Sequence, residues 1–277
     1  MKSLAMCAAT ILMLSGSGYV QAQDVAGGPP KILQIVSEEL KPTTSSAAHE
    51  KTEGAFLQAL VSSKSKSRYL GMTSLTGAPR ALFFSAYSSF GEWEEEVKGN
   101  SKLPGLDAAM DKAMAADGAL LSGITMTAWS HRSDMSMNEQ NLKGVRYLEI
   151  SQYNLKPGHT GEWGELARLV MAGYKEGIPE ASWTVYEQTY GGQGDSFLVI
   201  VTLKSAAEVD EHMAGGRKFA EALGPERMKK LEELTASSVE SQQSNIFVFA
   251  PKISYPDQAM TDADPTFWKQ PKVAPKK

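Results

Sequence analysis

The sequence contains ILQIVSEELKP at residues 32–42 and YLEISQYNLKP at residues 147–157, two versions of one stretch whose prolines lie 115 residues apart (157 − 42 = 115). A second pair follows at a similar distance, Ser89-Phe90-Gly91-Glu92 and Ser205-Ala206-Ala207-Glu208 (205 − 89 = 116). An internal repeat determines architecture before any local motif does. Two copies of one unit predict two similar sheets that pack on each other and share a space between them.

The first copy reads as a complete β-α-β-β-α-β unit. Strand-forming runs alternate with segments whose apolar residues recur at helical spacing, and turns at Gly77 and Pro104-Gly105 separate them. Ser45 and Ser89 are the expected helix caps, and Glu92 completes a capping box with Ser89. The expected strands are 32–42, 69–75, 81–87 and 124–131, and the expected helices follow Ser45 and Ser89 and cover 106–121.

The second copy repeats this order more clearly. One helix carries a continuous apolar stripe that includes Trp163, and the other starts at Ser205, is interrupted at Gly215-Gly216 and resumes at Pro225. The expected strands are 147–157, 182–190, 197–203 and 246–249. The runs 197–201 and 246–249 are almost continuously apolar, which indicates strands that are buried on both faces.

These patterns predict an α+β fold in which two ferredoxin-like units pack sheet to sheet as a pseudo-dimeric α/β barrel. The units cover residues 31–132 and 145–252, and a polar linker joins them. The tail, residues 256–277, is rich in proline and charge and is expected to be disordered unless Phe267-Trp268 docks on the body.

The N-terminus reads as a secretory signal over residues 1–22. Lys2 is followed by an apolar stretch, and Val20-Gln21-Ala22 is a small-x-small cleavage site. The only cysteine, Cys7, lies inside this segment; lipid attachment there is a weaker alternative, because Met6 directly before it is not small. The expected location is periplasmic or secreted.

Charge and hydropathy limit the classes of partner. Signal removal takes Lys2 away and leaves 27 basic residues (28 − 1) against 32 acidic ones, a net charge of −5 (27 − 32). An acidic chain without clustered Lys and Arg does not predict nucleic-acid binding. No apolar stretch reaches the roughly 20 residues that a membrane helix needs. We expect a monomer or a weak homo-oligomer, because fusion of the copies replaces a dimer.

The topology, the repeat and the two Leu-Lys-Pro strand ends resemble the dimeric α/β-barrel superfamily over about residues 32–250, in a tandem arrangement. This superfamily includes antibiotic-biosynthesis-monooxygenase-like and NIPSNAP-like domains. Its members include cofactor-free oxygenases, haem-degrading enzymes, isomerases and proteins without assigned activity. The resemblance implies a ligand site in the apolar space between a sheet and its helices or the facing sheet.

Haem degradation within this superfamily would require an Asn, a Trp and a His in one domain. The second copy offers Asn154 and His212 but no matching Trp, whereas the first offers Trp93 without the other two. Because the triad is split between the copies, no cofactor is expected. The four histidines are scattered and no metal-binding motif is present, so no metal site is expected either.

The candidate ligand-binding residues are aromatic or titratable side chains that the predicted elements place on common faces. Trp129 and His131 share a strand face, and His159 and Trp163 lie one helical turn apart. Along the strand 182–190, Trp183 and Glu187 take one face and Tyr186 the other. Each also has an ordinary structural interpretation: a strand end, a core residue, or a Glu187 that pairs with a lysine.

No pattern identifies a catalytic residue. The sequence therefore favours an exported protein that binds a small apolar or aromatic molecule in a barrel cavity without catalysis. The alternative is a cofactor-free monooxygenase or isomerase of the dimeric α/β-barrel type, in which Trp163, Tyr186 or His131 would take part.

Overall fold

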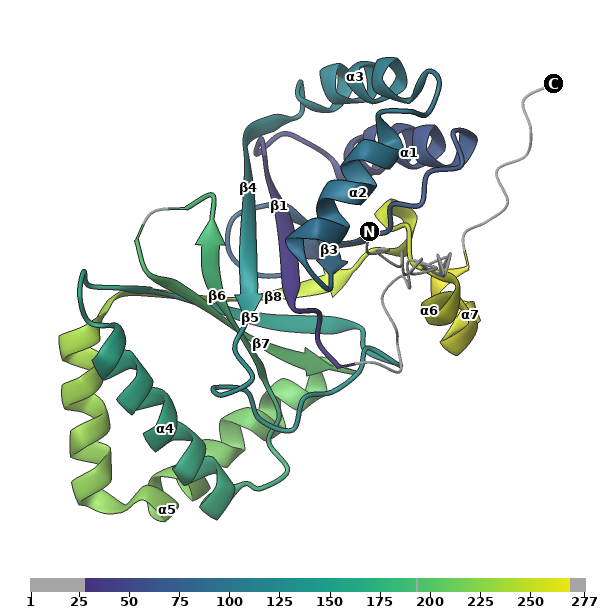
Figure 1. The fold of residues 1–277 in the computed structure, drawn as a ribbon. Helices are drawn as coiled ribbons and strands as arrows, with labels where there is room; N and C mark the ends of the chain where they lie inside the picture. Colours follow the sequence, from purple (N-terminus) through teal and green to yellow (C-terminus); the bar gives the residue numbers. More distant parts are fainter. Residues whose placement is uncertain (1–27, 193, 270–277) are drawn as a thin grey trace, which may run out of the picture.

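The structure is a computed structural model that describes residues 28–192 and 194–269 (Figure 1). The expected signal segment, residues 1–22, and the last eight residues lie outside the described residues. Signal cleavage therefore stays a prediction. Among the helices of the described part, none combines the length and apolar character that crossing a membrane requires.

The first half forms a four-stranded antiparallel sheet in the order β4-β1-β3-β2. Its helices α1 and α3 pack on each other at the outer face of the sheet (Figure 1), and α2 contacts β3. The elements are β1 Ile32–Leu40, α1 Ser46–Ser62, β2 Leu70–Ser74, β3 Arg80–Tyr87, α2 Phe90–Asn100, α3 Leu106–Asp117 and β4 Leu121–His131.

The second half repeats the arrangement with the order β8-β5-β7-β6. Its two helices, α4 and α5, pack against each other on the opposite side of the molecule from α1–α3 (Figure 1). The elements are β5 Tyr147–Leu155, α4 Thr160–Gly177, β6 Thr184–Tyr190, β7 Ser196–Leu203, α5 Ala207–Ser238 and β8 Val239–Phe249. The predicted duplication of a ferredoxin-like unit is therefore confirmed.

The two sheets join edge to edge and close into one barrel. β2 pairs with β8 in the register Met72↔Phe249, and β4 pairs with β6 in the register Trp129↔Gln188. Each of the eight strands thus has two hydrogen-bonded neighbours, and closure removes the free edges that would otherwise invite association. This is the α/β-barrel arrangement predicted from the sequence, and both of its sheets come from the same chain.

The interior of the barrel is a packed core. Alternate residues of each strand point inward, and Leu198 and Ile200 of β7 belong to the same buried cluster as Phe247 and Phe249 of β8. Burying each such side chain stabilises the fold by roughly 1.5–3 kcal/mol. The other interior residues include Leu33, Ile35, Leu70, Met72, Leu82, Phe84, Trp129, Leu148, Ile150 and Tyr186.

Helix starts follow the sequence in the first half and depart from it in the second. The Ser45 hydroxyl accepts from the Ala48 amide at 3.2 Å, and Ser89 accepts from the Glu92 amide at 3.1 Å, as predicted. For α5 the prediction of a Ser205 cap was wrong: Ala206 is the N-cap, without a side-chain bond. Of the expected capping box only the glutamate takes part: the Glu208 carboxylate accepts from the Lys204 backbone amide at 3.0 Å.

The predicted interruption of α5 at Gly215-Gly216 was also wrong, because the helix continues through both residues. The break lies at Gly224, whose φ of 70° is left-handed, directly before Pro225. Proline disfavours a helical conformation in the residue before it, and glycine accepts a positive φ without steric cost. Two glycines alone weaken a helix but leave its hydrogen bonds intact.

The expected disorder of the tail must be corrected for the residues that the structure describes. After a short helix η1 (Pro251–Ile253), the tail forms α6 (Gln258–Ala263) and α7 (Pro265–Trp268) and docks at one end of the barrel (Figure 1). Trp268 is 2% exposed and packs edge-on against Phe249. Arg146 pairs with Asp264 at 2.6 Å and lies over the Phe267 ring at 3.9 Å.

Replacing Trp268 by alanine should therefore lower the free energy of unfolding by about 3–5 kcal/mol, because it leaves a cavity in the barrel core. Chemical denaturation of the purified protein measures this change. Thr266→Ala, at an exposed position of the same helix, is the control and should be nearly neutral. Equal stability of the Trp268→Ala protein and the parent would show that the tail does not dock.

Candidate functional site

A large groove lies between the second pair of helices and their sheet, with a volume of about 1300 Å³. Helices α4 and α5 form one wall, and the outer faces of β5, β7 and β8 form the other. Four aromatic residues line it, Tyr153, Trp163, Tyr174 and Trp183. The aliphatic lining includes Leu166, Ala167, Val170, Val185, Val199, Val201 and Leu231.

The helices stay apart from the sheet because they are held at two separate places. Trp163 anchors the start of α4 to the sheet, with its ring centroid 5.0 Å from that of Tyr153 and 5.1 Å from that of Phe197. At the other end α4 packs on α5 through Gly173, where a Cβ atom would lie 2.7 Å from the Phe219 ring. Between these contacts, Val199 and Val201 remain only half-buried.

The polar groups of the groove act mainly as hydrogen-bond partners. Burial, and to a smaller extent the charge of Glu149, raises the pKa of the phenols of Tyr153 and Tyr174. Both phenols therefore stay neutral and can donate. The Tyr153 hydroxyl accepts from the Gln242 amide at 3.0 Å. His212 also lines the groove from an exposed position on α5.

The barrel itself offers much less room. A cavity of about 290 Å³ lies among the barrel-core residues Leu33, Phe84 and Tyr186 and next to Met260 of the docked tail. Trp129 fills the interior and donates its indole N–H to Thr127 at 2.7 Å. The larger of these two cavities therefore lies outside the barrel, under the helices of the second half.

The structure distributes the seven predicted ligand-binding residues over three places. Trp129 and Tyr186 lie in the barrel core, and His131, whose ring centroid is 5.5 Å from that of Tyr186, bonds to Glu139 beside them. Trp163 and Trp183 line the groove. The expected alternation along β6 is correct, since Tyr186 points inward while Trp183 faces the helices.

The two remaining predicted residues belong to neither cavity. His159 is the N-cap of α4, with its side chain 36% exposed and its Nδ1 3.2 Å from Glu162, so it does not share a face with the buried Trp163. Glu187 pairs with Arg132 at 2.6 Å, and the partner is an arginine rather than the expected lysine. Trp93 stacks on Tyr87 in the first half.

The corresponding place in the first half is filled by charged residues. Strand positions correspond at an offset of 115 (155 − 40 = 115), which matches Glu38 with Tyr153. The helix caps correspond at an offset of 114 (159 − 45 = 114), which matches His49 with Trp163 and Glu53 with Ala167. The last strands of the two halves, β4 and β8, start 118 residues apart (239 − 121 = 118). This offset matches Asp117 with Thr235.

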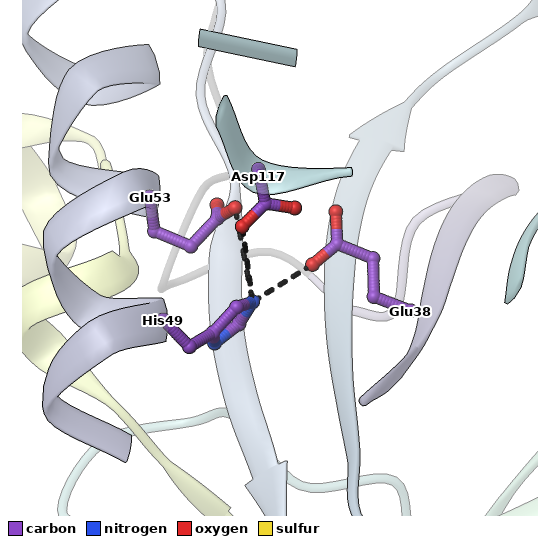
Figure 2. A group of neighbouring side chains, drawn as sticks. All are labelled: Glu38, His49, Glu53 and Asp117. Carbon is purple, nitrogen blue, oxygen red and sulfur yellow. Dashed lines mark hydrogen bonds and ion pairs between the residues drawn. The ribbon is translucent and has the colours of Figure 1, made fainter. Parts of the chain in front are cut away.

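These four residues of the first half, Glu38, His49, Glu53 and Asp117, form what we call the acidic cluster (Figure 2). One atom of each lies within 4.8 Å of the others. The Nε2 atom of His49 is 3.0 Å from Glu38, 3.8 Å from Glu53 and 3.9 Å from Asp117. All four side chains are at most 5% exposed.

Burial dominates the electrostatics of the acidic cluster. Desolvation, followed by the charges of Glu38 and Asp117, raises the pKa of Glu53 to about 9. Desolvation also raises the pKa of Glu38, against the opposing hydrogen bond from His49. The neighbouring Tyr69 has its pKa raised by burial and then by the charges of Glu53 and Glu38. With a pKa of about 9, Glu53 keeps its proton at neutral pH, because the buried cluster cannot carry three carboxylate charges without further compensation.

Sequence reasoning missed the acidic cluster. Glu38 and Asp117 are 79 residues apart (117 − 38 = 79), and neither belongs to a recognisable ligand motif. The one available signal was the i, i+4 spacing of His49 and Glu53, which places both on one helix face. A charged pair of this kind on an amphipathic helix is usually solvated, so it gave no reason to expect burial.

Comparison with protein-family models and with curated protein sequences finds no match. Solved structures with a similar course of the chain include a candidate monooxygenase from Fusobacterium nucleatum (12% identity, 80% of this chain and 93% of that chain, TM-score 0.49). An anthrone oxidase-like protein is also similar, at 11% identity over 83% of this chain and 94% of that chain, with a TM-score of 0.47. Chlorite dismutase from Candidatus Nitrospira defluvii in complex with imidazole is similar at 6% identity over 86% of this chain and 97% of that chain, with a TM-score of 0.46. Likeness at this level identifies no activity.

Trp163 should tolerate a smaller aromatic ring but not its removal. Its buried indole N–H has no hydrogen-bond partner among the described residues, so phenylalanine removes an unsatisfied donor while it keeps most contacts. We expect Trp163→Phe to change the free energy of unfolding by less than about 1.5 kcal/mol and Trp163→Ala to lower it by about 3–5 kcal/mol. Denaturant titration of both variants gives the answer; equal losses would contradict the assigned role of the ring.

Proposed function

We propose that the protein binds one small, planar and largely apolar molecule in the groove between α4, α5 and the outer face of β5, β7 and β8. The observation that carries this proposal is the difference between the halves. At corresponding places, the first half is filled by the acidic cluster, whereas the second leaves a space of about 1300 Å³ lined by four aromatic rings.

The composition of the groove favours an aromatic ligand. The half-buried aromatic residues of the lining, Tyr153, Tyr174 and Trp183, offer ring edges for contact with an aromatic ligand, beside the buried Trp163. The half-buried valines of β7 gain roughly 25 cal/mol for each Å² of apolar surface that a ligand covers. Neutral donors such as the Tyr174 phenol can fix one polar group of the ligand.

A second candidate function is turnover of the same ligand, either cofactor-free oxygenation or isomerisation. The observation that favours it is that Glu149 and His212 both line the groove, so a proton acceptor would be available. Binding without turnover remains the primary proposal, because no described residue bonds to His212 to orient its ring, and a catalytic base is usually held by a third group.

We also propose that the protein acts outside the cytoplasm, on the basis of the N-terminal apolar segment and its small-x-small site. In a bacterial host that secretes proteins through the general pathway, intact-mass measurement should give a chain that begins at Gln23. A mature chain that still begins at Met1 in the exported fraction, or no exported fraction, would contradict this assignment.

Filling the groove should abolish binding without unfolding the protein. Ala167 on α4 faces the groove from a half-buried position, so Ala167→Trp places an indole where the ligand would lie. With the fluorescent probe anilinonaphthalene sulfonate, we expect the affinity to fall at least ~10-fold, which corresponds to about 1.4 kcal/mol. Fluorescence titration of the folded variant measures the change.

The matched control is Lys175→Trp, which adds the same side chain at an exposed position of the same helix. Its probe affinity should equal that of the parent. Equal affinity of the Ala167→Trp protein and the parent would place the probe elsewhere and remove the proposal. Incubation with naphthol in an oxygen electrode separates the two functions: oxygen uptake that His212→Gln abolishes would establish turnover, whereas unchanged naphthol supports binding alone.

A further inference from the structure

We propose that the acidic cluster of Glu38, His49, Glu53 and Asp117 binds one divalent transition-metal ion, of the class of Zn²⁺ or Mn²⁺, as a closed structural site in the first half of the molecule. This site is separate from the groove and does not depend on the proposed ligand.

The distances within the cluster suit a four-coordinate ion. Metal–ligand distances of about 2.0–2.2 Å place tetrahedral ligand atoms roughly 3.3–3.6 Å apart. The three separations from His49 Nε2, which are 3.0, 3.8 and 3.9 Å, lie on either side of this range. Figure 2 shows the imidazole and the carboxyl groups of Glu53, Asp117 and Glu38 directed toward a common point. Small side-chain rotations would bring all four into contact with one ion.

Two buried carboxyl oxygens of the cluster without hydrogen-bond partners are a second observation that favours a cation ligand. Oδ2 of Asp117 and Oε1 of Glu53 are buried and have no hydrogen-bond partner among the described residues. Asp117 is 0% exposed and Glu53 4%. A buried carboxylate without a partner is costly, and buried charges are normally paired or bound to a metal. The Nε2 of one His49 cannot satisfy three carboxyl groups at once.

The ligand types identify the class of ion. An imidazole nitrogen favours transition metals over Ca²⁺ and Mg²⁺, which prefer oxygen ligands. Three carboxylates and a neutral imidazole carry a charge of −3, which a divalent ion reduces to −1. Thr52 donates to Oδ1 of Asp117 at 2.6 Å, the kind of outer hydrogen bond that orients a metal ligand.

The position of the cluster explains what the ion would do. Its residues come from β1, from α1 and from the end of α3, so one ion would join the helix layer to the sheet. With four protein ligands and no exposed side chain, the site leaves no open position for a substrate. It would therefore stabilise the closed helix–sheet contact that the second half lacks.

The test uses the full-length mature protein, isolated from medium supplemented with zinc and, separately, with manganese. Elemental analysis by plasma mass spectrometry gives the metal content per chain. Prolonged dialysis against a chelator, followed by titration with ZnCl₂ or MnCl₂ alone, gives the affinity and the shift of the thermal midpoint. Glu53→Gln and Asp117→Asn remove one charged ligand each with little change of shape, and the side-chain amide introduced by the second substitution keeps an acceptor for Thr52.

Glu50→Gln is the matched control, because Glu50 lies on the same helix but pairs with Lys252 at the surface. We expect one metal equivalent in the parent and in the control, a higher thermal midpoint with metal, and an affinity at least ~100-fold weaker in the other two variants. Those variants should remain folded without metal, because the amide of Glu53→Gln has nearly the shape of the carboxyl that it replaces and Asp117→Asn removes a charge from a crowded group, and circular dichroism verifies this. Absence of bound metal from the parent, or unchanged affinity in Glu53→Gln, would overturn the proposal.

Discussion

Hydrogen bonding between the edges of the two sheets, β2 with β8 and β4 with β6, is the constraint on which the rest of the structure depends. Once the barrel closes, every inward side chain must pack with those of the other half, and the interior becomes a core rather than a container. The docked tail, with Trp268 against Phe249, occupies part of one end. A cavity of about 290 Å³ remains among the barrel residues, and the larger groove of about 1300 Å³ lies between a sheet and its helices.

The two halves use that space in different ways although they share one topology. In the first half α1 and η1 cover the sheet, Ile253 packs with Ala81 and Phe83, and the acidic cluster fills the remaining volume. In the second half Tyr153, Trp163, Ala167 and Thr235 stand at the matching positions and line an open groove. After a duplication, one copy can keep stability while the other specialises in binding, and this division of roles fits the differences observed.

Much of the fold could be predicted from the sequence, because strand periodicity, turn residues and the repeat all indicate the same β-α-β-β-α-β order. The caps at Ser45 and Ser89 were predictable because they depend on neighbours within one turn. The kink at Gly224 was also encoded locally, by the proline after it, but the two glycines at 215 and 216 were a misleading signal. Docking of Trp268 depends on a pocket made by distant strands, which no local pattern reveals.

The candidate site was less predictable for the same reason. Trp163 and Trp183 were recognised as aromatic residues with a suitable position, yet the sequence could not show that Trp129 and Tyr186 point into the barrel core instead. The acidic cluster joins residues from three elements, and its chemistry arises from burial, which raises the pKa of Glu53. From the sequence alone, the residues of the acidic cluster would be taken for ordinary surface charges.

The most direct test of the central claim is a crystal structure of the mature protein soaked with naphthol. We expect an open groove with ring-shaped density between α4 and β7, in contact with Trp163 or Trp183, and no naphthol among the barrel-core side chains. Density for the naphthol inside the barrel, or α4 and α5 collapsed onto the sheet with no space beneath them, would contradict it.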